Sequence, residues 1–345
     1  MPTSQRPTRR RLPEFTLIRQ IASRLPRRPS DVIAGIGDDA AIVRLDAGSD
    51  LLLTTDLLAE RIHFDPRTAS WADIGFKAVA ANASDIAAMG GRPRHLLIAV
   101  ALSPTTPVRA VPALYRGIRD ACRRWGITLV GGDTSASASC MFLSLALTGI
   151  VPRGRALRRS GARIGDDIYV TGTLGDARAG LELLSRSIRH NGRPLAAGSR
   201  RLLIERHRRP TARVAEGARL SARRLATAAI DLSDGLSGDL RHVCEQSRVG
   251  AEIDAVRLPI SPACRAYAAA TGRSAIDLAL AGGEDYELLF TAPVRHRQAL
   301  IRLFGGRRPG ISRIGTIRPR VFGLQLREAS GRRAPLPNRS YEHFR

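Results

Sequence analysis

The sequence predicts a two-domain protein of the mixed α/β class (α/β in its second half, α+β overall). The chain has 345 residues, which is long enough for two domains that each bury a core. Apolar runs of strand length alternate with runs at helical spacing. A charged connector with Gly and Pro, residues 152–159, follows a β-rich first half and precedes alternating strands and helices. We therefore expect a disordered basic tail at 1–13, an N-terminal domain at 14–151 and a C-terminal α/β domain at 152–345.

The first half is predicted to begin with a helix and to continue as strands and helices. Its helix 71–89 is rich in alanine and is followed by Gly90, in the place of a C′ glycine. In order, we expect a helix over 14–25, a turn at 35–39, strands from 41 and over 50–56, the helix 71–89, a strand 95–102, a helix 107–125, a strand 127–130 running into a turn at 131–135, and a strand 141–151.

The second half is predicted to alternate more regularly. In order, we expect a strand 168–171, a helix through about residue 185, a loop 191–199, a helix 211–224, a strand 228–231, a helix 236–247, a strand 251–253, a segment 278–290 that closes as a strand, and short strands and turns in the remainder.

The formal charge of +24 comes almost entirely from arginine, because Lys77 is the one lysine among 55 basic residues. Such replacement is typical of a coding bias, and no nucleic-acid-binding motif or aromatic-basic interleaving accompanies it. Lys77 and Asp85 share a helix face about 12 Å apart, too far for a direct pair. A lysine retained in so arginine-rich a chain indicates that a guanidinium does not fit its position.

Composition also limits the compartment and the cofactors. The first twelve residues lack the apolar segment of a secretory signal, and no apolar run approaches the length of a membrane span. The four scattered cysteines form neither a zinc motif nor a disulfide framework. We therefore expect a cytoplasmic protein with no membrane partner and no specific nucleic-acid partner.

Acidic residues gather beside glycines and hydroxyls at turns after strands. Carboxylates with Thr54, Thr55 and Ser233, and without a sulfur or imidazole cluster, are the hard ligands that Mg²⁺ prefers. Because no Walker A motif is present, metals and Gly-rich turns would have to hold the phosphates of a nucleotide. The acids are Asp38, Asp39, Asp56, Asp85, Asp133, Asp231, Asp234, Glu284 and Asp285.

Eight motifs in order carry a resemblance to a known family. They are GIGDDAAIV, TTDLLAERIHF, KAVAANASDIAAMGG, LVGGDTS, GRALRRSGARIGDDIYVTGTLGDA, AIDLSDGLSGDL, GGEDYELLF and the terminal YEHF. The chain resembles the thiamine-monophosphate kinase family, in the superfamily of aminoimidazole ribonucleotide synthetase. The resemblance implies an N-terminal β-rich dimerisation domain, a homodimer, and direct in-line phosphorylation of thiamine monophosphate by ATP, assisted by several Mg²⁺ ions. The acceptor is already an anionic phosphate, so no general base is needed.

The resemblance also implies roles for individual residues. It places the ATP contacts at Gly132, Asp133, Arg159 and Ser233, with Tyr115 as a weaker candidate. It places the thiamine contacts at His63, Glu284 and Tyr341. After GGDT, the segment Ser135–Ser137 departs from the Arg and Gly that relatives often carry, which leaves nucleotide contacts there open. The implied magnesium ligands are Asp39, Thr54, Thr55, Asp56, Asp85, Asp133, Asp231 and Asp234.

Two alternatives stay open. Aminoimidazole ribonucleotide synthetase is the alternative enzyme, although it lacks the GGEDYELLF and YEHF patterns. A basic nucleic-acid-binding protein on a degenerate enzyme fold is the alternative from another class, and it would bind DNA with a steep salt dependence and no magnesium requirement. Selenophosphate synthetase would need a reactive Cys near the N-terminus, and the first cysteine is Cys122.

Overall fold

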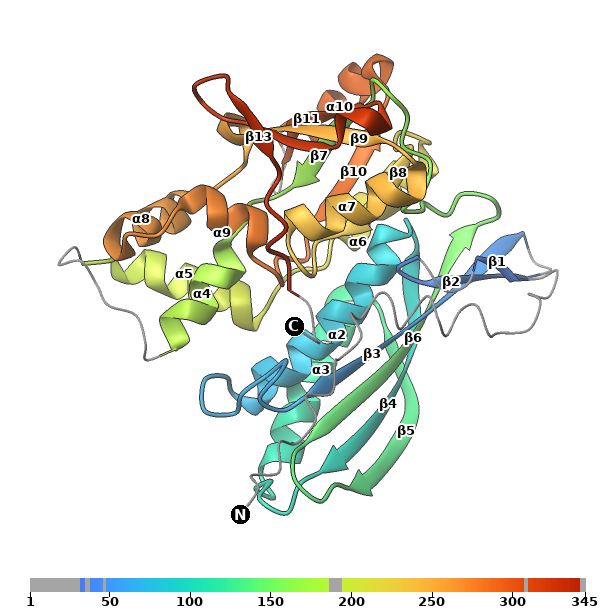
Figure 1. Cartoon of the computed structure of the whole chain (residues 1–345). Helices are drawn as coiled ribbons and strands as arrows, with labels where there is room; N and C mark the ends of the chain where they lie inside the picture. The colour runs from blue at the N-terminus through green and yellow to red at the C-terminus, as the bar shows by residue number, and fades with distance from the viewer. Residues whose placement is uncertain (1–31, 35–37, 46–47, 186–193, 307–309, 342–345) are drawn as a thin grey trace, which may run out of the picture.

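The computed structural model places two sheets with their helices one above the other (Figure 1). The predicted tail and the helix 14–25 lie outside the described residues. None of the described helices has the length and apolar character needed to cross a bilayer. The structure describes residues 32–34, 38–45, 48–185, 194–306 and 310–341.

The first sheet has six strands and forms the lower layer of Figure 1. Its central strand pair is antiparallel and long, since residues 49–59 pair with residues 142–152 along their whole length. In spatial order the strands are β1 (Val32–Ala34), β2 (Ala41–Arg44), β3 (Ser49–Ala59), β6 (Phe142–Pro152), β4 (Arg92–Leu102) and β5 (Thr128–Ala136).

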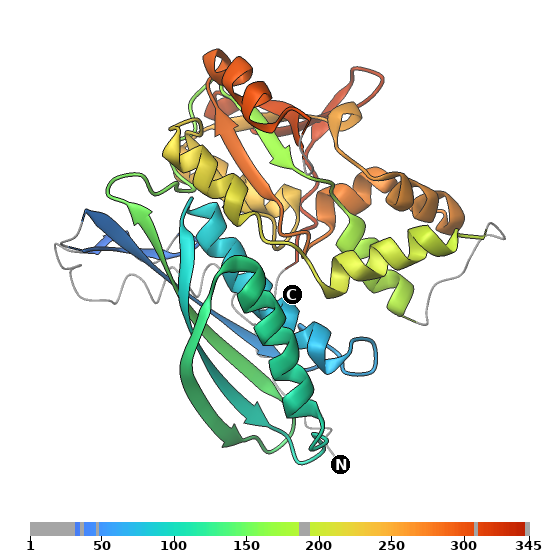
Figure 2. The ribbon, with the colours of Figure 1, turned by 180° about the vertical axis from the view of Figure 1, so that it is seen from behind.

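Two helices, α2 (Trp71–Ala88) and α3 (Ala110–Trp125), cover one face of this sheet (Figure 2). Ser70 caps α2 by accepting a hydrogen bond from the Asp73 N–H. Gly90 follows the helix with φ +71°, as the sequence predicted. On the opposite face, Leu53, Leu57 and Leu97 are 38 %, 59 % and 50 % exposed.

The second sheet has seven strands and is covered on both faces. In β7 (Asp167–Thr171), Ile168 and Val170 enter one core, whereas Tyr169 enters the other. This accounts for strands that are buried along their whole length. The strand order is β13 (Arg333–Pro335), β12 (Leu324–Arg327), β9 (Gly250–Asp254), β11 (Ile311–Arg318), β7, β10 (Leu288–Ala292) and β8 (Ala228–Asp231).

Seven described helices accompany the second sheet. One core contains side chains of α4, α5, α7, α8 and α9, and the other contains side chains of α6 and α10. Their bounds are α4 (Asp176–Leu184), α5 (Ala197–Arg208), α6 (Val214–Ala222), α7 (Leu236–Ser247), α8 (Pro262–Thr271), α9 (Ala275–Ala281) and α10 (Arg297–Phe304).

Helix α2 connects the two layers. Its last turn, at Ala87 and Ala88, packs against Leu288 of β10. Its neighbour α6 approaches closely because Gly217 has no side chain, and a Cβ there would lie 2.0 Å from the Ala87 carbonyl oxygen. The small residues of α2 thus allow a helix of the first domain to be buried on nearly all sides.

Several predicted elements were wrong. The expected turn at 131–135 is part of β5, because Gly132 lets two backbones approach: a Cβ there would lie 1.9 Å from the Ile98 carbonyl oxygen. The loop predicted over 191–199 overlaps α5, which buries only Leu203 and His207 and so shows little apolar periodicity. The C-terminal remainder contains α10, with Leu300, Leu303 and Phe304 on its buried face.

Candidate active site

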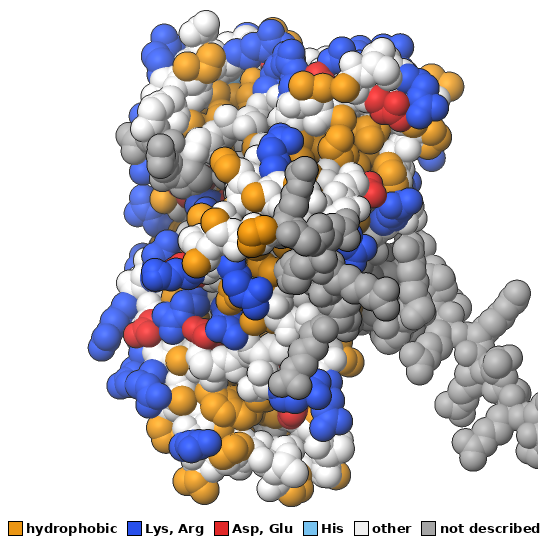
Figure 3. Space-filling model, turned by 90° about the vertical axis from the view of Figure 1, so that its left-hand side faces the viewer, with side chains coloured by type: hydrophobic (Ala, Val, Ile, Leu, Met, Phe, Trp, Pro, Cys, Tyr) orange, Lys and Arg blue, Asp and Glu red, His pale blue; other side chains and the backbone are white. Residues whose placement is uncertain are grey.

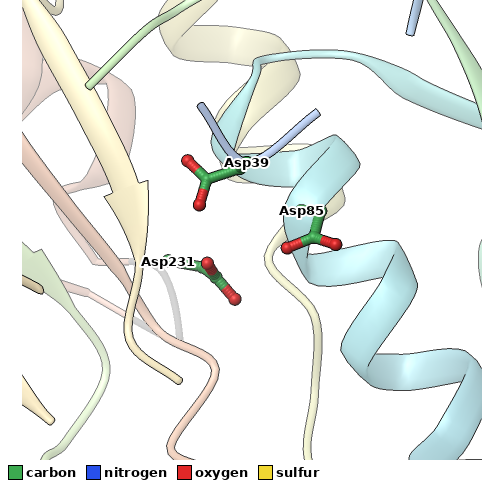
Figure 4. Close-up of side chains that lie close together, drawn as sticks. All are labelled: Asp39, Asp85 and Asp231. Atoms are coloured by element: carbon green, nitrogen blue, oxygen red, sulfur yellow. The ribbon is translucent and has the colours of Figure 1, made fainter. Parts of the chain in front are cut away.

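Three carboxylates from distant parts of the chain meet where the two layers join. Asp39 precedes β2, Asp85 lies in the last turns of α2, and Asp231 ends β8. One oxygen atom of each side chain lies within 4.8 Å of the others, and the carboxylates point toward a common space (Figure 4). Such a set of oxygen donors is typical of a divalent metal site.

The electrostatics of this acid cluster favour a bound cation when its carboxyl groups are ionised. Burial, and after it the neighbouring carboxylates, raise the pKa of Asp85 and of Asp231 well above the usual range. Asp39 Oδ2 is buried and has no hydrogen-bond partner among the described residues. These three carboxylates are hard ligands, and one of them has an oxygen without a hydrogen-bond partner among the described residues. Both features fit Mg²⁺.

Neighbouring groups hold the acid cluster in place. Arg159 Nη2 lies 2.5 Å from Asp39 Oδ1, and Thr54 Oγ1 donates a 2.5 Å hydrogen bond to Asp85 Oδ2. The Arg159 N–H donates to Asp38 Oδ1 over 3.0 Å, which fastens the connector to the turn that carries Asp39. Burial and the adjacent Asp39 raise the pKa of Asp38 to about 6.

A cavity of about 1220 Å³ opens beside the acid cluster. Asp56 of β3 lines it, and burial raises the pKa of that carboxyl to about 6. Residues of both halves of the chain form its wall, so the cavity lies between the two domains. The predicted residues that line it are Thr55, Asp56, His63, Ser233, Asp234, Glu284 and Tyr341.

Glu284 is the most strongly fixed of the predicted substrate residues. Lys77 Nζ lies 2.5 Å from its Oε1, and His207 Nδ1 lies 3.1 Å from its Oε2. Burial alone would raise the pKa of Glu284, but the Lys77 and His207 side chains outweigh it and lower the pKa to about 2. His63 is oriented by the Ala59 N–H, which donates to its Nδ1 over 3.0 Å. The cavity therefore holds a permanent carboxylate at neutral pH.

Some predicted residues lie away from the acid cluster. Asp133 of β5 pairs with Ala99 of β4. Ala99 pairs with Ser144 of β6, and Ser144 pairs with Leu57 of β3. Three strand spacings, about 14 Å, therefore separate Asp133 from β3, and Gly132 lies beside it in β5. Tyr115, on α3, packs into the N-terminal core and does not line the cavity. Thr55 is another predicted magnesium ligand, and its hydroxyl donates a hydrogen bond to the Leu145 carbonyl oxygen.

For three residues near the cavity, the sequence analysis gave either no role or an incomplete one. Asp239 of α7 is buried, and its Oδ2 accepts hydrogen bonds from the N–H groups of Asp234 and Gly235. Tyr286 lines the cavity with its backbone at φ +49°. The sequence indicated that the position of Lys77 requires a lysine, but it did not identify Glu284 as the partner of this side chain. For Asp239 the available signal was a second acid five residues after Asp234; for Tyr286 it was the GGEDYELLF motif alone.

The comparisons with known proteins agree with this architecture. Residues 37–151 match the family described as AIR synthase related protein, N-terminal domain, and residues 163–325 match its C-terminal domain. The fold and site thus define a two-domain protein of the AIR synthase type, and the mixed α/β prediction is confirmed. Similarity to curated relatives is more specific: the chain belongs to the thiamine-monophosphate kinase family.

The relatives cover almost the whole chain. The thiamine-monophosphate kinase of Escherichia coli (strain K12) is 39% identical over 331 residues, which is 96% of this chain and 98% of the relative. The structure of AaThiL complexed with AMPPCP and TMP has 34% identity and a TM-score of 0.82, covering 99% of this chain and 100% of that one. The thiamine-monophosphate kinase structure from Stenotrophomonas maltophilia K279a has 40% identity and a TM-score of 0.74, covering 93% and 98%.

Proposed function

We propose that this protein transfers the γ-phosphoryl group of ATP to the phosphate of thiamine monophosphate and releases thiamine diphosphate. The observation that carries the proposal is the acid cluster at one side of a cavity whose wall holds His63, Glu284 and Tyr341. A related structure, of nearly the same length and fold, is complexed with AMPPCP and TMP.

The acid cluster would hold Mg²⁺ through Asp39, Asp85 and Asp231, with Asp56 and Asp234 on the adjoining wall. When bound, magnesium neutralises charge on the two polyanionic substrates. Thr54 orients Asp85 for this role.

Arg159 has a donor to spare for phosphate. Its Nη2 holds Asp39, whereas its Nε is buried with no hydrogen-bond partner in the described part of the chain. A planar, always charged guanidinium at this position can bind an oxygen of the transferred group. The permanent carboxylate of Glu284 faces the other part of the cavity, where it can accept hydrogen bonds from the thiamine portion.

The direct test is to incubate the purified protein with ATP, Mg²⁺ and thiamine monophosphate and to follow thiamine diphosphate. We expect product formation that requires Mg²⁺. Absence of product, together with turnover of formylglycinamidine ribonucleotide, would favour aminoimidazole ribonucleotide synthetase instead.

Asp56→Asn tests the metal role of the cavity wall. We expect turnover to fall by at least about 100-fold, because the amide removes one negative charge facing the ions, while circular dichroism stays unchanged. An active Asp56→Asn enzyme would argue against this assignment.

We further propose a homodimer through the face of the first sheet that no helix of the described residues covers. Leu53, Leu57 and Leu97 expose an apolar surface there, and such surfaces are typical of interfaces. Asp133 shares this face by its register with Leu57, so a second copy would cover it.

Sedimentation would test the dimer. We expect Leu97→Glu to shift the wild-type dimer toward monomer, because it buries a charge in the interface. Ile301→Glu, on the exposed side of α10, is the matched control and should leave the dimer intact. A wild-type monomer at micromolar concentration would exclude this interface.

A further inference from the structure

Tyr286 has a backbone conformation that a bulky side chain rarely adopts. Its φ is +49°, and Glu284, two residues before, has φ +67°. Non-glycine residues in this left-handed region concentrate at functional sites, where the surrounding structure enforces them. Here the loop is fastened to the strand end that carries Asp231. The Glu284 N–H donates to the Ser233 carbonyl oxygen over 2.7 Å, and the Tyr286 N–H donates to the Leu232 carbonyl oxygen over 2.9 Å.

This backbone conformation places Tyr286 in the wall of the cavity. The side chain lines the cavity, and the residue is only 9 % exposed. The carboxylates that act electrostatically on its hydroxyl are that of Glu284, which lies in the substrate part of the site, and those of Asp56, Asp231 and Asp85, which lie in or beside the acid cluster. Burial, followed by these carboxylates, raises the pKa of Tyr286 well above its usual value, so the hydroxyl remains a hydrogen-bond donor at neutral pH.

The hydroxyl is available for a ligand. Within the part of the chain that the structure describes, no hydrogen bond joins the Tyr286 hydroxyl to another residue, and Tyr286 is one of the residues that line the cavity. An acceptor substrate with its organic part near Glu284 and its reacting group near Asp56 and Asp85 would pass this hydroxyl.

We propose that Tyr286 Oη donates a hydrogen bond to the phosphate group of the acceptor substrate. This inference rests on the proposed function, and it adds a phosphate-binding residue to the cavity. Tyr286 then discriminates the phosphorylated acceptor from the same molecule without its phosphate.

Tyr286→Phe removes the hydroxyl alone and keeps the ring. Calorimetry would measure the binding of thiamine monophosphate and of unphosphorylated thiamine to the full-length protein with Mg²⁺ and AMPPCP present. We expect roughly 10- to 100-fold weaker binding of thiamine monophosphate, the loss typical of one hydrogen bond to a charged group, and unchanged binding of thiamine. In turnover, the KM for thiamine monophosphate should rise while the Mg²⁺ dependence stays the same.

Tyr169→Phe is the matched control, because its hydroxyl contacts Asp167 in the core away from the cavity. It should bind both ligands like the wild type. Equal weakening of both ligands by Tyr286→Phe, no weakening, or a shifted Mg²⁺ dependence with unchanged thiamine monophosphate affinity would each overturn the inference. These results differ from failure of the proposed function, in which the wild-type protein itself neither binds nor converts thiamine monophosphate.

Discussion

At the scale of single residues, Lys77 has a role that arginine cannot take over. Its ammonium group is buried against Glu284, and its side chain is 7 % exposed. A guanidinium is longer, planar and carries its donors in a fixed fork. We expect Lys77→Arg to lower kcat/KM for thiamine monophosphate by about tenfold or more, as measured by steady-state kinetics.

Lys77→Met tests the electrostatic part of the same contact. Glu284 has a pKa lowered to about 2, so acidification to pH 5 leaves the wild-type carboxylate charged. Without Lys77 the remaining effect of burial raises that pKa, and we expect substrate affinity to fall as the pH drops from 8 to 5. Arg332→Met, which removes an exposed partner of Glu328, is the control. A pH profile of Lys77→Met that matches the wild type would contradict the prediction.

The candidate site was predictable from sequence where the signal was local. Acids beside glycine and hydroxyls indicated a metal site, and the family resemblance placed Asp39, Asp85 and Asp231 among its eight implied magnesium ligands; the structure brings these three together. The contact of Lys77 with Glu284 was not predictable, because it joins segments far apart in the chain. Asp133 shows the opposite problem: its Gly-Gly-Asp signal is local, but its position depends on a strand register that sequence does not reveal.

At the scale of elements, the contact between α2 and α6 sets the distance between the two domains. A Cβ at Gly217 would lie 2.0 Å from the Ala87 carbonyl oxygen, so Gly217→Ala must push the helices apart. We expect a loss of about 1–3 kcal/mol in the free energy of unfolding. Activity should also fall, because Asp85 on α2 would move relative to Asp231. Thermal unfolding and kinetics measure the two effects.

Gly198→Ala is the control for this substitution. Gly198 also lies in a helix, α5, but nothing approaches its Cβ position within 4 Å. Alanine there should stabilise the protein by about 0.5–1 kcal/mol, through its better helix propensity. If Gly217→Ala were as stable and active as Gly198→Ala, the close contact between α2 and α6 would not constrain the site.

Elements were predicted best where periodicity was strong. The Ala-rich α2 and the apolar β7 and β8 have clear patterns, and all three appear. Helix α5 was missed because four of its twelve residues are arginines and only two of its side chains are buried. Its stability comes from packing against α4 and α8, which is tertiary information.

At the scale of the whole molecule, arginine dominates the surface. Figure 3 shows one face with far more blue side chains than red ones, consistent with a formal charge of +24. Three of the 31 acids are instead gathered where the two layers join, as the acid cluster. The metal-free protein thus holds like charges together at the junction of its two layers, and its stability should depend on pH and magnesium.

The sign of that dependence follows from the raised pKa values. Asp38 and Asp56 each have a pKa raised to about 6, and burial and the neighbouring carboxylates also raise the pKa of Asp231 well above its usual range. Their protonated forms therefore stabilise the fold below about pH 4, and this stabilisation is lost as the pH rises through 6. His207, whose pKa is lowered by burial and Lys77, acts in the opposite direction over the same range. The acids outnumber it, so we expect the metal-free Tm to fall between pH 5 and pH 7.5.

Magnesium should reverse this fall, because it binds the deprotonated carboxylates. Calorimetry with and without Mg²⁺ should therefore show a larger gain in Tm at pH 7.5 than at pH 5. Asp231→Asn removes one of the repelling charges: its metal-free Tm should be higher than that of the wild type at pH 7.5, by on the order of 2 °C for each kcal/mol of repulsion relieved. The variant should also gain less from Mg²⁺. A metal-free Tm that rises with pH, or equal gains from Mg²⁺ in both proteins, would show that the acid cluster is not the place where charge repulsion and metal binding meet.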